Sequence, residues 1–306
     1  MTKLHIAYGD AYLDWQLGEG HPTNPERALL ATDLLIDKLG EDNIEVVEPT
    51  YIDEDIEELC EVHSPDYVTE VLVDGISNDW AGSQPHLGVT ALTMFAGTAR
   101  LVEKMIAGEA QVAFNPQGAK HHAHYDYSNG FCVFNDFAWA GKEFAKHGLK
   151  ALYIDWDAHH GDGVEELLYD TTIPTMSIHD GTIYPGTGRD GHTEIFSVYN
   201  WALARNSGDV EFAQAMDEIR ELADKYQPDV VMLATGADAH KTDPLSSLQF
   251  DYAGYEYASG IVADIANTYS QGRVLIGGAG GYQPHTHTPS IWSEVVSSIY
   301  EKTRVS

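Results

Sequence analysis

The stretch YIDWDAHHGD, residues 153–162, concentrates carboxylate and imidazole side chains that suit a divalent cation. Its first residues favour a β-strand, on which Asp155, Asp157 and His159 alternate onto one face. Asp238 supplies a further carboxylate just after another expected strand. Asp157, His159 and Asp238 would make three ligands and leave one position for water, as at catalytic zinc sites. Helix caps and turns would account for one such Asp, but not for this combination.

The segment AKHHAH, residues 119–124, offers a pair of neighbouring imidazoles, His121 and His122. Histidines supply a general acid and a general base near neutral pH, and an oriented carboxylate sets the pKa of each. The other histidines carry no such signal: His124 is expected at the surface or one layer behind the site, and His160, His285 and His287 are expected to be structural.

A glycine-rich segment, GGAGGY, ends at Tyr282. It lacks the Lys-Ser/Thr pair of a phosphate-binding loop and the downstream acidic partner of a dinucleotide site. A tyrosine at the end of such a stretch suits a phenol that reaches into a site and stabilises an oxyanion.

Short apolar runs that alternate with amphipathic stretches must position these residues. The expected strands are His5–Tyr8, Gln111–Phe114, Ala151–Asp155, Thr175–His179, Val230–Thr235 and Val274–Gly277. The expected helices are Pro25–Leu39, Val89–Ile106, Phe134–His147, Val210–Tyr226 and Tyr252–Tyr269. This alternation predicts one α/β domain over residues 1–306, with a parallel sheet flanked by helices on both faces.

Four polar clusters, residues 120–126, 155–162, 238–243 and 277–282, each come after an expected strand. Ligands of open α/β sheets bind outside the carboxyl ends of the strands. The clusters are therefore expected to form one site.

Composition limits the classes of protein that fit. The 306 residues include 48 acidic and 17 basic ones, a formal net charge of −31, which argues against direct binding to nucleic acid and favours cationic substrates. Two cysteines, Cys60 and Cys132, exclude a disulfide framework or a cysteine metal site. Without a secretory signal or an apolar run of about 20 residues, we expect a soluble cytoplasmic protein and no membrane contact. Dense carboxylates also fit a protein from a high-salt environment.

Taken together, these motifs resemble those of the histone deacetylase superfamily, which includes acetoin-utilisation deacetylases and acetylpolyamine amidohydrolases. The matching segments run in the family's order from about residue 20 to residue 292 and are closest to the acetoin-utilisation branch. They are residues 113–123 (AFNPQGAKHHA), 128–136 (SNGFCVFND), 153–163, 177–179, 184–188 (YPGTG), 236–245 (GADAHKTDPL) and 277–282.

The resemblance implies the arginase–deacetylase fold, with a parallel sheet of about eight strands. It also implies a role for each matching residue. The zinc ligands would be Asp157, His159 and Asp238; the tandem histidines His121 and His122, with Asp155 and Asp162 as their carboxylates; the catalytic tyrosine Tyr282; and the acyl-lysine tunnel Gly130, Phe131, Tyr184 and Leu245. A structural potassium ion would take the Ser177 hydroxyl and main-chain carbonyls of Asp155, Asp157, His159 and Ile178.

The function implied is hydrolysis of an acetyl-amide, such as acetyl-lysine in proteins, by metal-activated water. The metal would be Zn²⁺, with Fe²⁺ as an alternative. Two other readings stay open: an amidohydrolase for acetylated polyamines or other small amines, and a catalytically silent module that binds acyl-lysine. A dimanganese ureohydrolase of the same fold is disfavoured, because Gly161 stands where the second metal needs a carboxylate.

Three positions leave the family pattern or the assignment open. Ala279 interrupts the glycines before Tyr282, and Asp79 is a candidate for the rim residue that grips the substrate backbone. Cys132 lies next to Phe131 and is expected to be a small buried side chain rather than a redox-sensitive thiol. The oligomeric state has no signature in the sequence.

Overall fold

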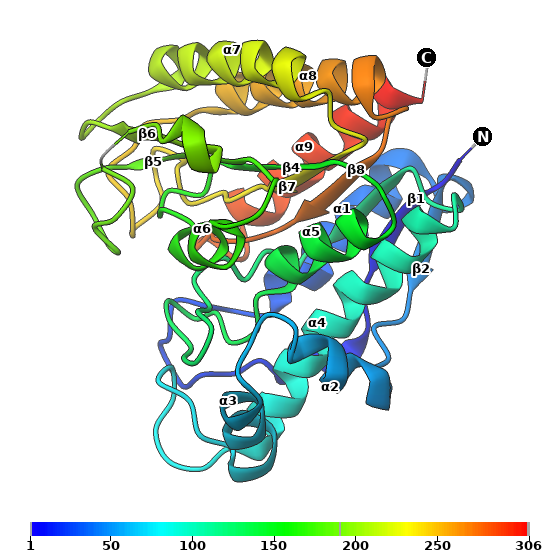
Figure 1. The fold of residues 1–306 in the computed structure, drawn as a ribbon, viewed down its shortest axis with the longest axis vertical. Helices are drawn as coiled ribbons and strands as arrows, with labels where there is room; N and C mark the ends of the chain where they lie inside the picture. Colours follow the sequence, from blue (N-terminus) through cyan, green and yellow to red (C-terminus); the bar gives the residue numbers. More distant parts are fainter. Residues whose placement is uncertain (1, 190, 305–306) are drawn as a thin grey trace.

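In the computed structural model, which describes residues 2–189 and 191–304, eight strands form one sheet in which every pairing is parallel (Figure 1). Their spatial order is β2-β1-β3-β8-β7-β4-β5-β6. The strands are β1 (Leu4–Ala7), β2 (Ile44–Val47), β3 (Val112–Asn115), β4 (Ala151–Asp155), β5 (Thr175–Asp180), β6 (Val198–Leu203), β7 (Val230–Ala234) and β8 (Val274–Gly277).

Helices cover both faces of this sheet. On one face, α7 packs on α8, α8 on α9 and α9 on α1; on the other, α4 packs on α5 and α5 on α6. The helices are α1 (Glu26–Leu39), α2 (Asp53–Leu59), α3 (Pro65–Thr69), α4 (Pro85–Ile106), α5 (Asp136–Lys146), α6 (Asp162–Leu168), α7 (Asp209–Tyr226), α8 (Tyr252–Tyr269) and α9 (His287–Thr303). Short 3-10 or π turns are η1 (Asp10–Asp14), η2 (Glu41–Asn43), η3 (Glu70–Asp74) and η4 (Glu194–Phe196).

Strand β4 shows how the sheet divides the core into two layers. Leu152 and Ile154 are buried in the cluster that contains α7, α8 and α9, whereas Ala151 and Tyr153 are buried in the cluster that contains α4 and α5. A strand buried on both faces needs apolar residues at successive positions, which explains its continuous apolar run. Each such large side chain contributes roughly 1.5–3 kcal/mol by leaving water. The predicted parallel sheet with helices on both faces is confirmed.

Several elements were missed in the sequence. The strands β2 and β6 lie at the two edges of the sheet, where they are only partly buried, and each carries a polar residue, Glu45 or Asn200, that interrupts its apolar run. Helix α9 packs between α1 and α8, so that most of its length is buried and its sequence lacks a regular polar face. The short helices α2, α3 and α6 span seven residues or fewer, too short for a reliable period.

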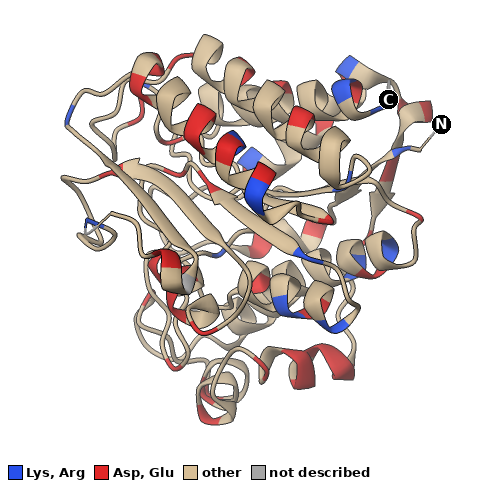
Figure 2. Cartoon of the chain, turned by 45° about the horizontal axis from the view of Figure 1, so that its top comes forward, with Lys and Arg blue, Asp and Glu red and all other residues tan. Residues whose placement is uncertain are grey.

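Acidic residues recur along the outer helices, where Lys and Arg are sparser (Figure 2). Helix α2 alone carries Asp53, Glu54 and Asp55 in its first turn. Adaptation to high salt stays a prediction. In the described part of the chain, no helix is both long and apolar enough to span a membrane.

One row of the sheet brings the polar clusters together. Strand pairing places Asn115 beside Gly277, Gly277 beside Ala234, Ala234 beside Asp155, and Asp155 beside Ser177. Four of these residues end their strands, so the segments that follow leave the sheet from one edge.

Candidate metal centre and active site

Asp157, His159 and Asp238 meet at this edge and are buried, with exposed fractions of 1%, 8% and 0%. One potential ligand atom from each lies within 4.8 Å of the other two. The Nδ1 atom of His159 is 3.0 Å from Asp157 Oδ1 and 2.9 Å from Asp238 Oδ2. Two carboxylates and one imidazole thus converge on one point.

Backbone groups hold the two carboxylates in place. The N–H of Ala158 donates to Asp238 Oδ1 at 2.9 Å, and the N–H of Gly280 donates to Asp157 Oδ2 at 2.5 Å. A Cβ atom at Gly280 would lie only 2.2 Å from Asp238 Oδ2. The glycine-rich segment therefore lets the backbone approach the ligands closely.

The electrostatics of the triad fit a bound cation. Burial and the charge of Asp157 raise the pKa of Asp238 to about 7, while the two carboxylates hold the pKa of His159 well above its ordinary value, against the effect of burial. The positive charge of protonated His159 thus partly balances the negative charges of Asp157 and Asp238. A divalent cation on the same atoms would neutralise both carboxylates and leave His159 neutral, so these residues fit a metal such as Zn²⁺.

His121 and Asp155 form the first histidine–carboxylate pair, with His121 Nδ1 2.8 Å from Asp155 Oδ2. The Tyr153 hydroxyl donates to the same carboxylate oxygen at 2.6 Å. Burial opposes a charge on His121, but Asp155 and Asp157 outweigh it and raise its pKa to about 9. This imidazole is therefore cationic at neutral pH.

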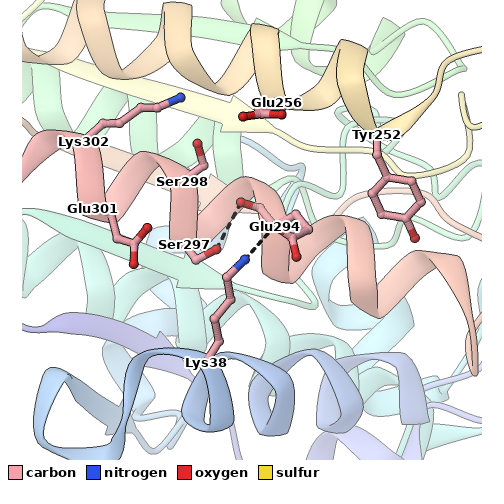
Figure 3. A pocket seen from close by; sticks show the side chains of 8 residues that line it. All are labelled: Lys38, Tyr252, Glu256, Glu294, Ser297, Ser298, Glu301 and Lys302. Atoms are coloured by element: carbon pink, nitrogen blue, oxygen red, sulfur yellow. Dashed lines mark hydrogen bonds and ion pairs between the residues drawn. The ribbon is translucent and has the colours of Figure 1, made fainter.

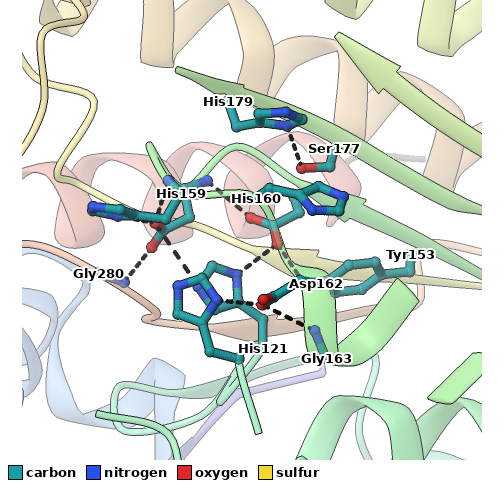
Figure 4. A network of polar contacts seen from close by, with 12 residues as sticks. His121, Tyr153, His159, His160, Asp162, Gly163, Ser177, His179 and Gly280 are labelled. Carbon is teal, nitrogen blue, oxygen red and sulfur yellow. Dashed lines mark hydrogen bonds and ion pairs between the residues drawn. The ribbon is translucent and has the colours of Figure 1, made fainter. Parts of the chain in front are cut away.

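His122 and Asp162 form the second pair, with His122 Nδ1 2.6 Å from Asp162 Oδ1. Burial and the charge of His121 lower the pKa of His122 to about 3. Its ring is therefore neutral near pH 7 and able to accept a proton. Figure 4 shows His121, His159 and Asp162 converging in one polar network.

A pocket of about 410 Å³ opens above His122 and His159 and is lined by all four expected tunnel residues, Gly130, Phe131, Tyr184 and Leu245. The Tyr184 ring lies 5.2 Å from that of His122, centroid to centroid. Gly130 has φ 54°, and a Cβ there would meet His122 Cδ2 at 2.4 Å. The pocket therefore leads from the surface to the histidines.

Asp79 lines the same pocket, and its Oδ1 accepts the Phe131 N–H at 3.0 Å. Its Oδ2 is buried without a hydrogen-bond partner, and burial raises its pKa. Asp79 Oδ2 could therefore accept a hydrogen bond from an N–H group of a substrate in this pocket.

Tyr282 also lines this pocket, with its ring 6.4 Å from that of His159. Its backbone N–H donates to Asp243 Oδ2 at 2.8 Å. Burial, together with the charges of Asp238 and Asp157, raises the phenol pKa well above its ordinary value. The hydroxyl therefore keeps its proton and can donate it in a hydrogen bond. Ala279 adopts the left-handed conformation, φ 55°, that glycine usually takes.

A separate hollow between α1, α8 and α9 has about 330 Å³ (Figure 3). It is lined by Lys38, Tyr252, Glu256, Glu294, Ser297, Ser298, Glu301 and Lys302. The Lys38 ammonium there pairs with Glu294 at 2.6 Å. With neither histidine nor cysteine in its lining, this hollow shares nothing with the site above.

Residues 21–299 match the family model of the histone deacetylase domain. The chain belongs to the histone deacetylase family.

Similar proteins agree with this assignment. Acetoin utilization protein AcuC of Bacillus subtilis (strain 168) is 32% identical over 318 residues, covering 96% of this chain and 81% of that protein. A probable deacetylase of Archaeoglobus fulgidus is 30% identical over 294 residues, covering 90% of this chain and 80% of that protein. The crystal structure of the HDA15 HD domain matches with a TM-score of 0.84 at 22% identity, covering 98% of this chain and 88% of that one.

These matches confirm the resemblance to the acetoin-utilisation branch and the arginase–deacetylase fold. They also confirm that the chain is a hydrolytic deacetylase of the histone deacetylase family.

His124 contributes more to this deacetylase site than its sequence position indicated. It is only 6% exposed, so a surface position is wrong, and it lies one layer behind the site. Its Nε2 is 3.4 Å from Asp162 Oδ2, and its Nδ1 is 2.6 Å from Glu166 Oε2. The ring of Tyr127 stacks on it, with centroids 4.4 Å apart. The spacing of Asp162 and Glu166 on α6 was the available signal, since residues four apart share a helix face.

Two further residues beside the histone deacetylase site went unnoticed in the sequence. Arg27 on α1 and Lys120 just before His121 are buried, with exposed fractions of 3% and 8%. No local pattern joins them, because they come from distant parts of the chain.

Proposed function

We propose that residues 1–306 form one zinc-dependent deacetylase domain that hydrolyses an acetyl-amide, with acetyl-lysine in proteins as its substrate. The observation that carries this proposal is the proximity of three groups of residues, each of which contributes one side chain to the lining of the 410 Å³ pocket: His159, His122 and Tyr282. The three groups are the Asp157, His159 and Asp238 triad, the two histidine–carboxylate pairs, and Tyr282.

Asp157, His159 and Asp238 would hold Zn²⁺, with Fe²⁺ as the alternative ion. When bound, the cation would act as a Lewis acid on the acyl carbonyl and lower the pKa of water to about 7.

His122 is the general base in this proposal. Asp162 engages Nδ1 of His122, which leaves Nε2 to take a proton from the attacking water and return it to the departing amine. The lowered pKa of His122 keeps its ring neutral, with a lone pair free for that proton, while the raised pKa of His121 favours a positive charge on the neighbouring ring.

Tyr282 stabilises the oxyanion that forms from the acyl carbonyl. Its raised phenol pKa keeps the O–H in place as a hydrogen-bond donor. A binding module that catalyses nothing would need neither this donor nor a neutral His122, so retention of both favours an enzyme.

The pocket walls suit the apolar stem of an acylated lysine, since Phe131, Tyr184 and Leu245 line it. The net charge of −31 favours cationic molecules in general, so an acetylated polyamine is a second candidate substrate. The potassium ion also stays a prediction: Ser177 and Ile178 are buried on β5 beside the end of β4, and the Ser177 hydroxyl lies 3.0 Å from His179 Nδ1.

The proposal is tested by stripping the protein with a chelator, reloading it with Zn²⁺ or Fe²⁺, and measuring acetate release. An acetyl-lysine peptide and an acetylated polyamine are compared, at low and at molar KCl. Release from the peptide that returns only with metal supports the proposal. Faster release from the polyamine would make the small amine the substrate, and no release from either would refute deacetylation.

A further inference from the structure

Beside Asp157 of the metal triad lies a second, smaller cavity of about 20 Å³. It shares His122, Gly130, Phe131 and Tyr282 with the larger pocket and reaches Asp157. An acyl group whose carbonyl sits at the triad would therefore direct its far end into this cavity.

Two buried cations line this inner cavity, Arg27 and Lys120. The Arg27 guanidinium lies over the Trp292 ring, 5.1 Å from its centroid, and donates from Nη1 to the Gly281 carbonyl at 2.8 Å. The Lys120 ammonium has one contact, the amide oxygen of Gln117 at 3.5 Å. Within residues 2–189 and 191–304, neither cation pairs with a carboxylate.

Further polar groups around this cavity lack partners. Arg27 Nε and Thr23 Oγ1 are both buried without a hydrogen bond, and both residues line the cavity. Burial, reinforced by the Arg27 charge, lowers the pKa of Lys120 to about 8, which leaves its ammonium form prevalent at pH 7. Unpaired buried charges and donors destabilise a fold strongly, so their concentration here indicates a ligand that supplies acceptors.

An acetyl group would end here in a methyl, which offers no acceptor. A carboxylate would accept from Lys120, Arg27 and Thr23 together and neutralise a buried charge. The small volume favours the shortest dicarboxylic acyl group, malonyl, in which one carboxylate replaces one methyl hydrogen of acetyl.

We propose that this inner cavity is a carboxylate subsite, formed by Lys120 and Arg27, that makes the enzyme prefer malonyl-lysine over acetyl-lysine. This rests on the proposed deacylase function and keeps its chemistry. The amide C–N bond breaks, the oxygen of water joins the acyl carbon, and the water protons pass to the amine. Malonate leaves in place of acetate.

The test compares one lysine peptide carrying acetyl, malonyl or succinyl, using the zinc-loaded enzyme and its Lys120→Met variant. The ratio of kcat/KM for malonyl over acetyl should exceed one in the wild type and fall about ten- to a hundred-fold in Lys120→Met, since a charged hydrogen bond is lost. Succinyl should lie between the other two. Lys225→Met on α7 removes an equal charge far from the cavity and should leave the ratio unchanged.

Thr23→Val keeps the shape of the side chain but removes its hydroxyl, and it should lower the malonyl-over-acetyl ratio of kcat/KM by a smaller factor. This variant provides a second test of the subsite if Lys120→Met does not fold. A ratio that Lys120→Met and Thr23→Val both leave intact would overturn the subsite.

If the wild type cleaves none of the three peptides, the proposed function fails, and binding of free anions decides the subsite alone. Malonate should then raise the unfolding temperature of the wild type more than acetate or chloride at equal ionic strength, and this margin should vanish in Lys120→Met. Equal effects of malonate and chloride would overturn it. An effect of acetate as large as that of malonate would show a site for the product carboxylate instead, and would also overturn it.

Discussion

His121 and His122 lie with ring centroids only 4.0 Å apart, yet their pKa values are driven in opposite directions, to about 9 and about 3. Against the effect of burial, Asp155 and Asp157 raise the pKa of His121, whereas burial and then the charge of His121 lower the pKa of His122. Neighbouring groups whose pKa values separate in this way take different roles in acid–base catalysis.

His122→Ala should therefore lower kcat by about 10²- to 10⁴-fold, the usual contribution of a general base. His121→Ala removes a fixed charge rather than the base, and its loss should be smaller. Steady-state kinetics on an acetyl-lysine peptide measures both, with the exposed His147→Ala on the far end of α5 as the control. A larger loss in His121→Ala than in His122→Ala would reverse the assignment.

His124→Phe should lower kcat about tenfold with little change in KM. Phenylalanine keeps the ring stacked on Tyr127 but removes the contact that helps to hold Asp162 behind His122, and a hydrogen bond to a charged group contributes roughly 1.5–3 kcal/mol. The same kinetic assay checks this, with circular dichroism to confirm folding. Unchanged kcat in a folded variant would mean that Asp162 needs no support from His124.

Gly130→Ala should lower kcat strongly, because its Cβ would lie 2.4 Å from His122 Cδ2 and the imidazole is held by Asp162. Gly148→Ala is the matched control: its φ of 74° imposes similar backbone strain, but nothing lies within 4 Å of the added Cβ. Gly148→Ala should lose only the stability that this backbone strain costs and should keep its kcat, so the loss of kcat in Gly130→Ala isolates the contact with His122. Equal kcat values would contradict the clash.

Glu58→Gln should stabilise the fold at pH 8 more than at pH 5. Burial and the neighbouring Asp55 and Glu143 raise the pKa of Glu58 from 4.5 to about 7, so the folded state binds more protons than the unfolded state between these values. Its contribution to stability is present below about pH 4.5 and is lost as the pH rises through 7. Glutamine does not ionise, so Glu58→Gln should abolish this loss of stability at high pH.

Thermal unfolding of Glu58→Gln at the two pH values measures this difference. The gain at pH 8 should be no more than about 1 kcal/mol, because partial exposure screens the charge. Glu57→Gln, at the exposed neighbouring position, serves as the control. A gain that is the same at both pH values would show that Glu58 does not titrate as described.

Long elements with a clear start signal and strand-end motifs could be predicted from the sequence. Helix α8 has the predicted bounds, Tyr252–Tyr269, because Asp251 caps its start and no proline interrupts the eighteen residues that follow. The pair Asp157 and His159 stood out since a single strand end carries both. In contrast, α9 was missed because burial on several sides removes the polar face that marks a helix.

Contacts between distant segments could not be predicted in the same way. Arg27 and Lys120 meet only because α1 and the loop after β3 converge beneath the triad. The burial of His124 depends likewise on α6 packing against the loop that carries it. Such contacts are set by tertiary packing, which leaves no period in the sequence.

The buried triad of Asp157, His159 and Asp238 is expected to hold the metal that the deacetylase needs. We would measure zinc content and acetate release together for the wild type and for Asp238→Asn, which removes one carboxylate charge with little change in shape. We expect about one zinc ion per wild-type chain together with acetate release, and a folded variant that loses both. A folded Asp238→Asn variant that keeps its zinc and its full turnover would contradict it.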